Sequence, residues 1–181
     1  TATPTPTPTI TGQATATNTP QPTPTPLNAY LWSFGYNYWG QLGDNGAQIS
    51  SSQPVQTTYS TAVWRTIGHS HSDSNAAIKN DGTFWTWGRN TYGSLGLGNS
   101  VSASTPTQVL LGGNDWVFCA SNVYNTIAIK ADGSLWSCGQ NAYGQMGTNN
   151  TTNSSLFLKV KGSKLWKNTV AGKQSFFAIA V

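Results

Sequence analysis

The sequence predicts an all-β protein: a three-bladed partial β-propeller of about 51-residue repeats with an extended Thr/Pro-rich N-terminal arm. Three observations lead to this prediction. Charged residues make up only 8% of the chain, while 12% of it is aromatic and 19 residues are glycine, a composition typical of strands and tight turns rather than helical bundles. A Trp-containing motif recurs three times, and the first 26 residues have a composition of their own.

The N-terminal arm, residues 1–26, holds 11 Thr and seven of the nine Pro, and no charge occurs before Asp44. Alternating Pro removes every second backbone donor and biases the preceding residue toward extended angles, so the arm is expected to be polyproline-II chain. Such a segment is either a stiff linker or, as in many Thr/Pro-rich stalks, an O-glycosylated one. The candidate O-glycosylation sites are Thr3, Thr5, Thr7, Thr9, Thr19, Thr23 and Thr25.

Residues 27–181 form the predicted repeat domain. Three segments align without gaps: Leu31–Gly43, Phe84–Gly96 and Leu135–Gly147. Their tryptophans, Trp32, Trp85 and Trp136, lie 53 and 51 residues apart. A second tryptophan recurs in the other half of the repeat at Trp64, Trp116 and Trp166. Self-similarity at this period indicates a propeller, a solenoid or another repeat array.

Within each repeat the residues predict hairpins. The apolar stretches 76–78 and 127–129 run into Asp81-Gly82 and Asp132-Gly133, and Asp-Gly pairs between strands are a strong hairpin signal. One Asn per repeat is expected to tie a loop through hydrogen bonds from its side chain to the backbone. These are Asn37, Asn90 and Asn141. Two positions after each Asn stands an aromatic residue, which is interpreted as a core or turn residue. These residues are Trp39, Tyr92 and Tyr143.

The motif L-W-x-x-G-x-N-x-(W/Y)-G-x-L-G resembles the repeat of the regulator of chromosome condensation family, and the resemblance covers residues 27–181. It implies a propeller of four-stranded blades, usually seven. It also implies use in protein–protein contacts, guanine-nucleotide exchange, chromatin binding or, in some bacterial members, enzyme inhibition.

The chain departs from the family pattern in ways that limit what the resemblance implies. It has three repeats rather than seven, and no segment resembles an exchange-factor wedge. Ser74, Asn125 and Ser175 stand where the family often has His. We therefore expect the chain to have the blade fold of the family but not its nuclear activity.

The phase of the repeat predicts open blade edges, because the sequence starts and stops inside a blade. Unpaired strand edges are adhesive and are normally covered. We therefore expect copies of the chain to join head to tail as a homo-oligomer, and a contact that does not close gives a filament. The expected assembly edge is formed by Leu31, Trp32, Ser33, Phe34, Phe176, Phe177, Ala178 and Ile179. The resulting functional prediction is a non-enzymatic structural subunit of an extracellular, cell-surface or virion-surface fibre.

A second prediction is a protein- or glycan-binding propeller module, present here as a fragment of a larger propeller. In that case loop aromatics such as Tyr36, Tyr38 and Trp39 would grip the ligand. Monomeric behaviour in solution and a saturable ligand would favour this alternative over the fibre.

Catalytic, metal and cofactor chemistry find little support in the sequence. The chain has no Glu, and two of its five Asp are explained by turns, so paired catalytic carboxylates are not expected. His69, His71 and Asp73 lie close together but no fourth ligand is evident, so no metal site is predicted. No nucleophile elbow or phosphate-binding loop with Lys is present, and no cofactor is expected.

The remaining signals concern charge and modification. Five lysines in the last 23 residues favour a solvated edge over a nucleic-acid site, and no apolar run approaches the ~18 residues of a membrane span. Asn149, Asn150 and Asn153 begin N-x-Ser/Thr sequons and are candidate N-glycosylation sites, although a plain polar loop between strands is the favoured explanation. Cys119 and Cys138 are either two buried thiols or a disulfide formed in an oxidising compartment.

Overall fold

The described part of the protein is built from strands. The computed structural model describes residues 30–181 except 47, 60–62, 71–72 and 173. Within these residues it contains thirteen strands and one short 3-10 helix, η1 (Thr91–Gly93), which confirms the all-β prediction. The Thr/Pro arm, its threonines and the boundary at residue 26 lie outside the described residues.

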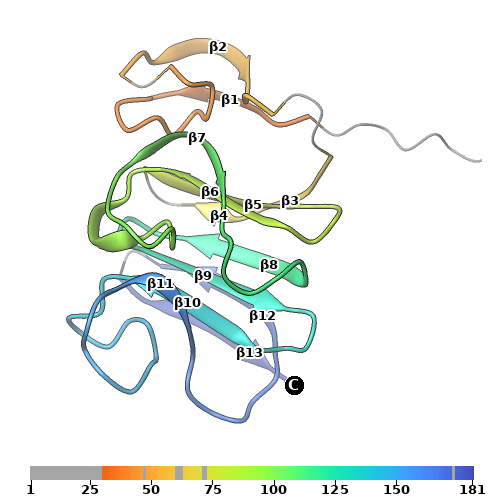
Figure 1. The fold of residues 1–181 in the computed structure, drawn as a ribbon, viewed down its shortest axis with the longest axis vertical. Coiled ribbons are helices and arrows are strands. Elements are labelled where there is room, and N and C mark those ends of the chain that lie inside the picture. Colours follow the sequence, from red (N-terminus) through yellow and green to blue (C-terminus); the bar gives the residue numbers. More distant parts are fainter. Residues whose placement is uncertain (1–29, 47, 60–62, 71–72, 173) are drawn as a thin grey trace, which may run out of the picture.

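Two complete blades lie at the centre of the molecule (Figure 1). The first has the strand order β3-β5-β6-β7 and the second the order β8-β9-β10-β11, with every neighbouring pair antiparallel. Their bounds are β3 (Trp64–Ile67), β5 (Ser74–Lys79), β6 (Phe84–Gly88), β7 (Ala103–Gln108), β8 (Trp116–Ser121), β9 (Asn125–Lys130), β10 (Leu135–Gly139) and β11 (Ser154–Lys159). A short strand, β4 (His69–Ser70), runs parallel to the end of β8 in the second blade, where His69 lies opposite Ala120, and so joins the two blades.

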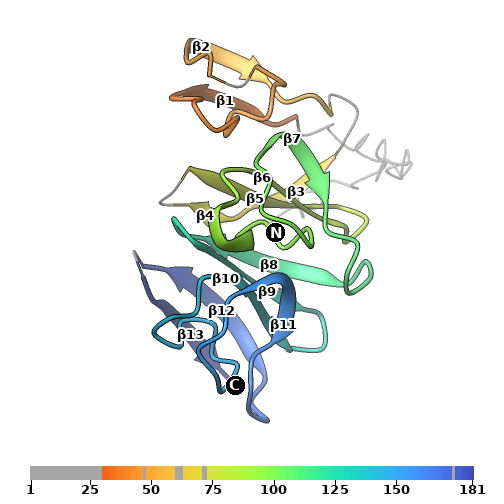
Figure 2. The ribbon, with the colours of Figure 1, turned by 60° about the vertical axis from the view of Figure 1, so that its left-hand side comes forward.

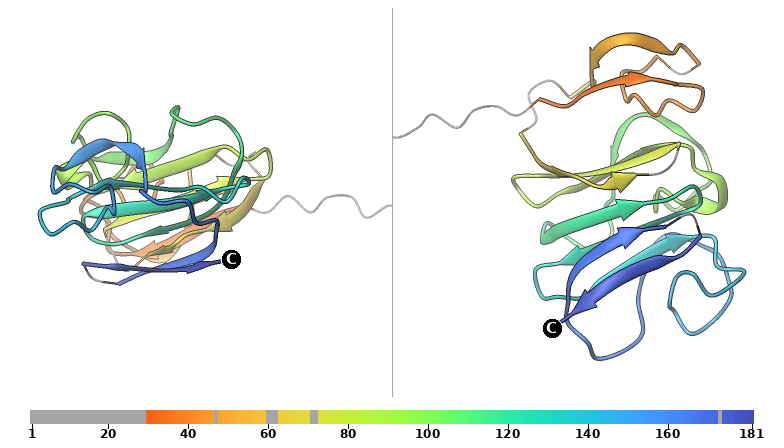
Figure 3. Two further views of the ribbon diagram at one scale, coloured as in Figure 1. Left: turned by 90° about the horizontal axis from the view of Figure 1, so that it is seen from below. Right: turned by 180° about the vertical axis from the view of Figure 1, so that it is seen from behind.

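A two-stranded unit flanks each side of the central pair, and the four units stack along the long axis (Figures 2 and 3). On one side β1 (Trp32–Gly35) pairs with β2 (Ser51–Gln56), and on the other β12 (Trp166–Ala171) pairs with β13 (Phe176–Ala180). By register, β1 and β2 correspond to the last two strands of a blade, and β12 and β13 to the first two. The described residues therefore form the partial propeller that the repeat predicts.

The two Asp-Gly hairpins form where the sequence places them. Gly82 and Gly133 turn with φ of 79° and 77°, which is the left-handed region that favours glycine. The Asp81 carboxylate accepts hydrogen bonds from the hydroxyl and backbone N–H of Thr83, and these hydrogen bonds lower the pKa of Asp81. Asp132 is arranged alike, so each turn is closed by its own carboxylate.

The main core lies between the two complete blades. Phe84, Trp116 and Phe157 are fully buried there, with ring centroids 5.3 to 5.8 Å apart. Cys119 and Cys138 belong to the same cluster and are free thiols, so the disulfide considered from the sequence is not formed in this structure. Burial raises the pKa of the Cys119 thiol to about 12, and it raises the pKa of Cys138 as well.

The predicted assembly edge lies on the two flanking units. Trp32 and Phe34 on β1 are 55% and 70% exposed, whereas Leu31 is buried against Trp64. On β13 the side chains alternate, with Phe177 and Ile179 exposed and Phe176 and Ala178 packed against the second blade. Among the described residues β1 pairs only with β2 and β13 only with β12. Assembly through these strands remains an untested prediction.

Candidate functional site

Two sets of loops gather at one end of the stacked blades, on the left in Figure 1. One set joins the third and fourth strands of each blade and includes residues 36–50, 89–102 and 140–153. The other joins the first and second strands and includes 122–124. Because the strands alternate in direction, both sets lie at the same end, and the Asp-Gly turns lie at the opposite end. Side chains far apart in the sequence therefore meet on one surface.

A buried Asn fixes each of the longer loops, as the sequence predicted. In the first complete blade, Asn90 Oδ1 accepts the Leu95 N–H at 2.8 Å, and Asn90 Nδ2 donates to the Val101 carbonyl at 3.0 Å. Asn37 and Asn141 make the same pair of contacts in their own loops. All three side chains are fully buried. Each loop is thus held from inside, and its outward residues are left free.

The outward residues are aromatic. We call this surface the aromatic rim, and it consists of Tyr36, Tyr38, Trp39, Tyr92, Tyr124 and Tyr143. Tyr143 is 81% exposed, and the rings of Tyr36 and Tyr38 stack at 6.2 Å between centroids. Tyr92 contacts Tyr124 edge-on at 5.4 Å across the two complete blades. The repeated Tyr92 and Tyr143, interpreted from the sequence as core or turn residues, lie in turns with their rings exposed.

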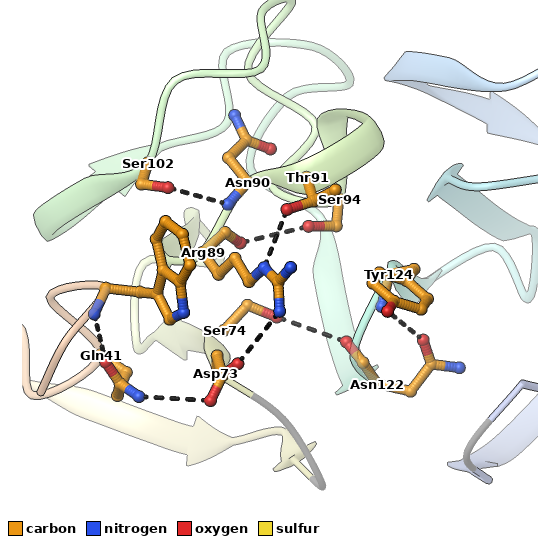
Figure 4. Close-up of polar contacts among 11 residues, drawn as sticks. Gln41, Asp73, Ser74, Arg89, Asn90, Thr91, Ser94, Ser102, Asn122 and Tyr124 are labelled. Atoms are coloured by element: carbon orange, nitrogen blue, oxygen red, sulfur yellow. Dashed lines mark hydrogen bonds and ion pairs between the residues drawn. The ribbon is translucent and has the colours of Figure 1, made fainter. Parts of the chain in front are cut away.

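Arg89 lies at the centre of the aromatic rim. Its guanidinium is 4.9 Å from the ring of Trp39 on one flanking unit and 5.8 Å from the ring of Tyr124 on the second blade. It also pairs with the Asp73 carboxylate at 3.4 Å and donates from Nε to Thr91 at 2.8 Å (Figure 4). One cation thereby contacts three successive units, and each cation–π contact at such a site contributes about 0.5–1 kcal/mol.

Gln41 connects the same cluster to the flanking unit. Its side-chain amide donates to Asp73 at 3.4 Å, and its side-chain oxygen accepts the Trp39 backbone N–H at 2.9 Å. Its backbone carbonyl accepts from Asn75 and from the Trp87 indole. The position of the aromatic rim is therefore fixed by polar contacts between units as well as by packing.

The opposite end of the blades has a different character, because most of the charge lies there. Lys79 sits 3.4 Å from the ring centroid of Trp85, and burial lowers the pKa of Lys79. Lys130 pairs with Asp115 at 2.9 Å. Four of the five clustered lysines are exposed on or near this end: Lys159, Lys161, Lys164 and Lys167. The fifth, Lys173, lies outside the described residues.

The sequon residues lie in the loop fixed by Asn141. Asn153 Oδ1 accepts the Asn141 backbone N–H at 2.7 Å, Asn150 accepts from the Asn141 side chain, and Asn149 has a φ of 64°. All three are exposed, and their glycosylation stays a prediction. Among the described residues no group of three or more His, Cys, Asp or Glu is placed to hold a metal ion. His71 is not among those residues.

Sequence reasoning missed Arg89, Gln41 and Tyr124. Arg89 occupies the variable position between the conserved-looking Gly and Asn of the repeat, where the other copies have Tyr36 and Gln140. Variation inside an otherwise constant motif is the signal that could have found it, since the Gly and Asn on either side shape the loop and the residue between them does not.

Comparison with known proteins supports the repeat assignment. Residues 81–129 match the family model of the Regulator of chromosome condensation (RCC1) repeat, and residues 119–145 match a second model with the same description. The chain is 30% identical to Protein RCC2 of Mus musculus over 122 residues, or 66% of this chain and 23% of that protein. It is 31% identical to the Ultraviolet-B receptor UVR8 of Arabidopsis thaliana over 64% of this chain and 26% of the receptor. The chain thus spans about a quarter of the length of these relatives.

Solved structures give the same fold. The crystal structure of Prp20p from Saccharomyces cerevisiae, described with its binding to Gsp1p and histones, superposes with a TM-score of 0.75 at 16% identity. The match covers 86% of this chain and 40% of Prp20p.

These comparisons correct two predictions. The relatives are a receptor and proteins of a regulator family, and Prp20p binds histones and Gsp1p, so the predicted extracellular structural filament is wrong. Histones are intracellular, as are these relatives, so the predicted extracellular or surface location is wrong as well. Among the described residues no helix is long and apolar enough to cross a membrane.

Proposed function

Because the chain belongs to the regulator of chromosome condensation (RCC1) repeat family, we propose that it is a non-enzymatic protein-binding propeller module that recognises its partner through the aromatic rim. The observation that carries this proposal is that four exposed Tyr rings gather at one end of the blades, together with the half-buried Trp39 and Tyr124 that contact Arg89. Tyr, Trp and Arg are the residue types that contribute most to protein interfaces.

The rim also has the physical properties of a protein-binding surface. Its loops are held in place by buried Asn residues, and Arg89 holds Trp39 and Tyr124, so little backbone conformational entropy is lost on binding. Among the described residues the rim loops carry few charges, chiefly Asp44, Asp73 and Arg89, and the last two neutralise each other. A partner with an apolar or aromatic surface fits better than a highly charged one. A second copy of this chain is among the candidate partners.

The test compares two variants of the full chain, one with three Tyr→Ser substitutions on the rim and one with a single Leu→Ser substitution at the opposite end. A partner captured from extracts of the source organism is identified by mass spectrometry and then titrated directly. We expect Tyr36→Ser, Tyr92→Ser and Tyr143→Ser together to weaken binding at least tenfold, since they remove exposed rings. The control is Leu110→Ser, which removes a side chain that is 85% exposed at the opposite end. Equal binding by the two variants would contradict the proposal.

A further inference from the structure

A shallow groove lies at the edge of the aromatic rim, between the β1–β2 unit and the first complete blade. It is lined by Tyr38, Trp39, Gln48, Ser102 and Ser104 and has a volume of about 270 Å³. This is close to the lower end of ligand sites, about 300–1,000 Å³, so it suits a short piece of extended chain. No charged residue lines it.

We propose that this groove binds a Thr-Pro segment of the chain's own N-terminal arm in polyproline-II conformation. Aromatic-lined grooves recognise proline-rich chain because that conformation is already formed before binding. The residues that line the groove, the composition of the arm and the length of chain between them all support the assignment. The inference goes beyond the proposed function, since it concerns a ligand within this chain at one edge of the rim.

The chemistry of the groove matches alternating Thr and Pro. A polyproline-II helix has three residues per turn, so residues i and i+3 share an edge. In a strict Thr-Pro repeat that edge presents a Pro ring next to a Thr hydroxyl. The groove offers the same pairing, because Tyr38 and Trp39 supply ring surfaces while Gln48, Ser102 and Ser104 supply polar groups.

The groove also offers donors that a polyproline-II backbone needs, since its carbonyls make no internal hydrogen bonds. Among the described residues the Trp39 indole N–H and the Tyr38 hydroxyl have no hydrogen-bond partner. The indole N–H groups of Trp85, Trp87 and Trp136, by contrast, are all bonded. Two unbonded donors beside two ring faces suit a ligand that brings acceptors and no donors at its proline positions.

The charge of the arm and the length of chain that joins it to β1 both agree with the arm as occupant of the groove. The arm has no charged residue, and neither has the lining of the groove. Residues 19–26 (T-P-Q-P-T-P-T-P) end four positions before Tyr30, which lies two residues ahead of β1. At about 3.1 Å per residue the chain from Thr19 to Tyr30 spans roughly 34 Å, whereas the extended chain from Tyr30 to the end of β1 spans only about 17 Å. The segment can therefore return along β1 to the groove.

The test uses the full chain with the seven arm prolines changed to Ala, which leaves the groove vacant. A synthetic peptide of residues 19–26 is titrated while the NMR signal of the Trp39 indole N–H is followed. We expect a saturable shift, no shift with a peptide in which Pro is replaced by Ala, and on the order of tenfold weaker binding to the unmodified chain, where the tethered arm competes at millimolar effective concentration.

Two variants locate the site. Tyr38→Ala is expected to weaken peptide binding at least fivefold, whereas Tyr143→Ala, equally on the rim but far along the stack, is expected to leave it unchanged. No saturable shift at millimolar peptide would overturn the groove as a polyproline-II site. Equal affinity for the arm variant and the unmodified chain would overturn the arm as occupant. Competition that grows with protein concentration would overturn occupation within one chain. None of these results depends on partner binding through Tyr92 and Tyr143.

Discussion

The two complete blades and the two flanking units share the repeat motif but differ in how far the side chains of that motif are buried. One position of the motif shows this, since it is 3% exposed as Trp87 and 0% as Cys138 in the complete blades but 70% exposed as Phe34 in the β1–β2 unit. The motif thus defines the shape of a blade, whereas burial depends on whether a neighbour lies against it. In repeat proteins stability divides in this way between the unit and its interfaces.

The largest expected difference follows from that position. Trp87→Ala should lower the free energy of unfolding by about 3–5 kcal/mol, because it empties a buried site that is also tied to the Gln41 carbonyl. Phe34→Ala should cost no more than about 0.5 kcal/mol, because the ring is exposed. Urea unfolding of both variants measures the costs. A large cost for Phe34→Ala would show that another chain covers β1 in solution.

Two loop glycines with nearly the same backbone conformation allow the complete blade to be compared with an open loop. Gly93 and Gly144 have φ of 77° and 76°, so Ala at either position meets the same left-handed strain of about 1–2 kcal/mol. At Gly93 the added Cβ would also overlap the backbone of Ser155 on the next blade, whereas at Gly144 nothing lies within 4 Å. Gly93→Ala should therefore cost about 1–3 kcal/mol more. Thermal unfolding should separate the two variants by several degrees, and coincident midpoints would contradict the contact.

Removal of the buried Asn is expected to cost the same stability in a complete blade as in a flanking unit. Asn90→Ala and Asn37→Ala should each cost about 1–3 kcal/mol, because each leaves a buried backbone N–H without its acceptor. Both sets of bonds lie within one loop, so the costs should agree within about 0.5 kcal/mol by urea unfolding. A much smaller cost for Asn37→Ala would mean that the loop depends on neighbouring blades after all.

The smallest effect concerns pH. Hydrogen bonds from Thr83 hold the pKa of Asp81 below its ordinary value of 3.8. A lowered pKa in the folded state means that this stabilisation is present above about pH 4 and is lost as the pH falls through the lowered pKa. Asp81→Asn should therefore be slightly less stable than the unmodified chain at pH 6, with the difference vanishing near pH 2. Asp132→Asn should behave alike, and a difference that persists at pH 2 would rule out the carboxylate as its source.

The repeat made much of the fold predictable. The hairpins at Asp81-Gly82 and Asp132-Gly133 and the loops tied by Asn37, Asn90 and Asn141 follow from local chemistry, which one repeat contains in full. The aromatic rim could not be predicted in the same way. Trp39, Tyr92 and Tyr143 share one position of the motif, and only the arrangement of neighbouring units decides how much of each ring faces solvent.

The functional prediction failed at a related point. The open edges of β1 and β13 are present in the described residues, as the phase of the repeat predicted. An unpaired edge does not say what covers it, however, and the step from open edges to an extracellular fibre had no chemical support in the sequence. The exposed rings and Arg89 point instead to recognition on the loop side of the blades.

The buried Asn in each loop has a consequence for how such a surface changes over generations. The loop conformation is stabilised by hydrogen bonds between the buried Asn and backbone atoms. The neighbouring side chains that point outward are available for contact with other molecules. Substitution at Tyr36 or Gln140 is therefore expected to change the outward surface with little loss of stability in the loop beneath it. Duplicated copies of one loop can in this way diverge in specificity while the blade beneath them stays the same.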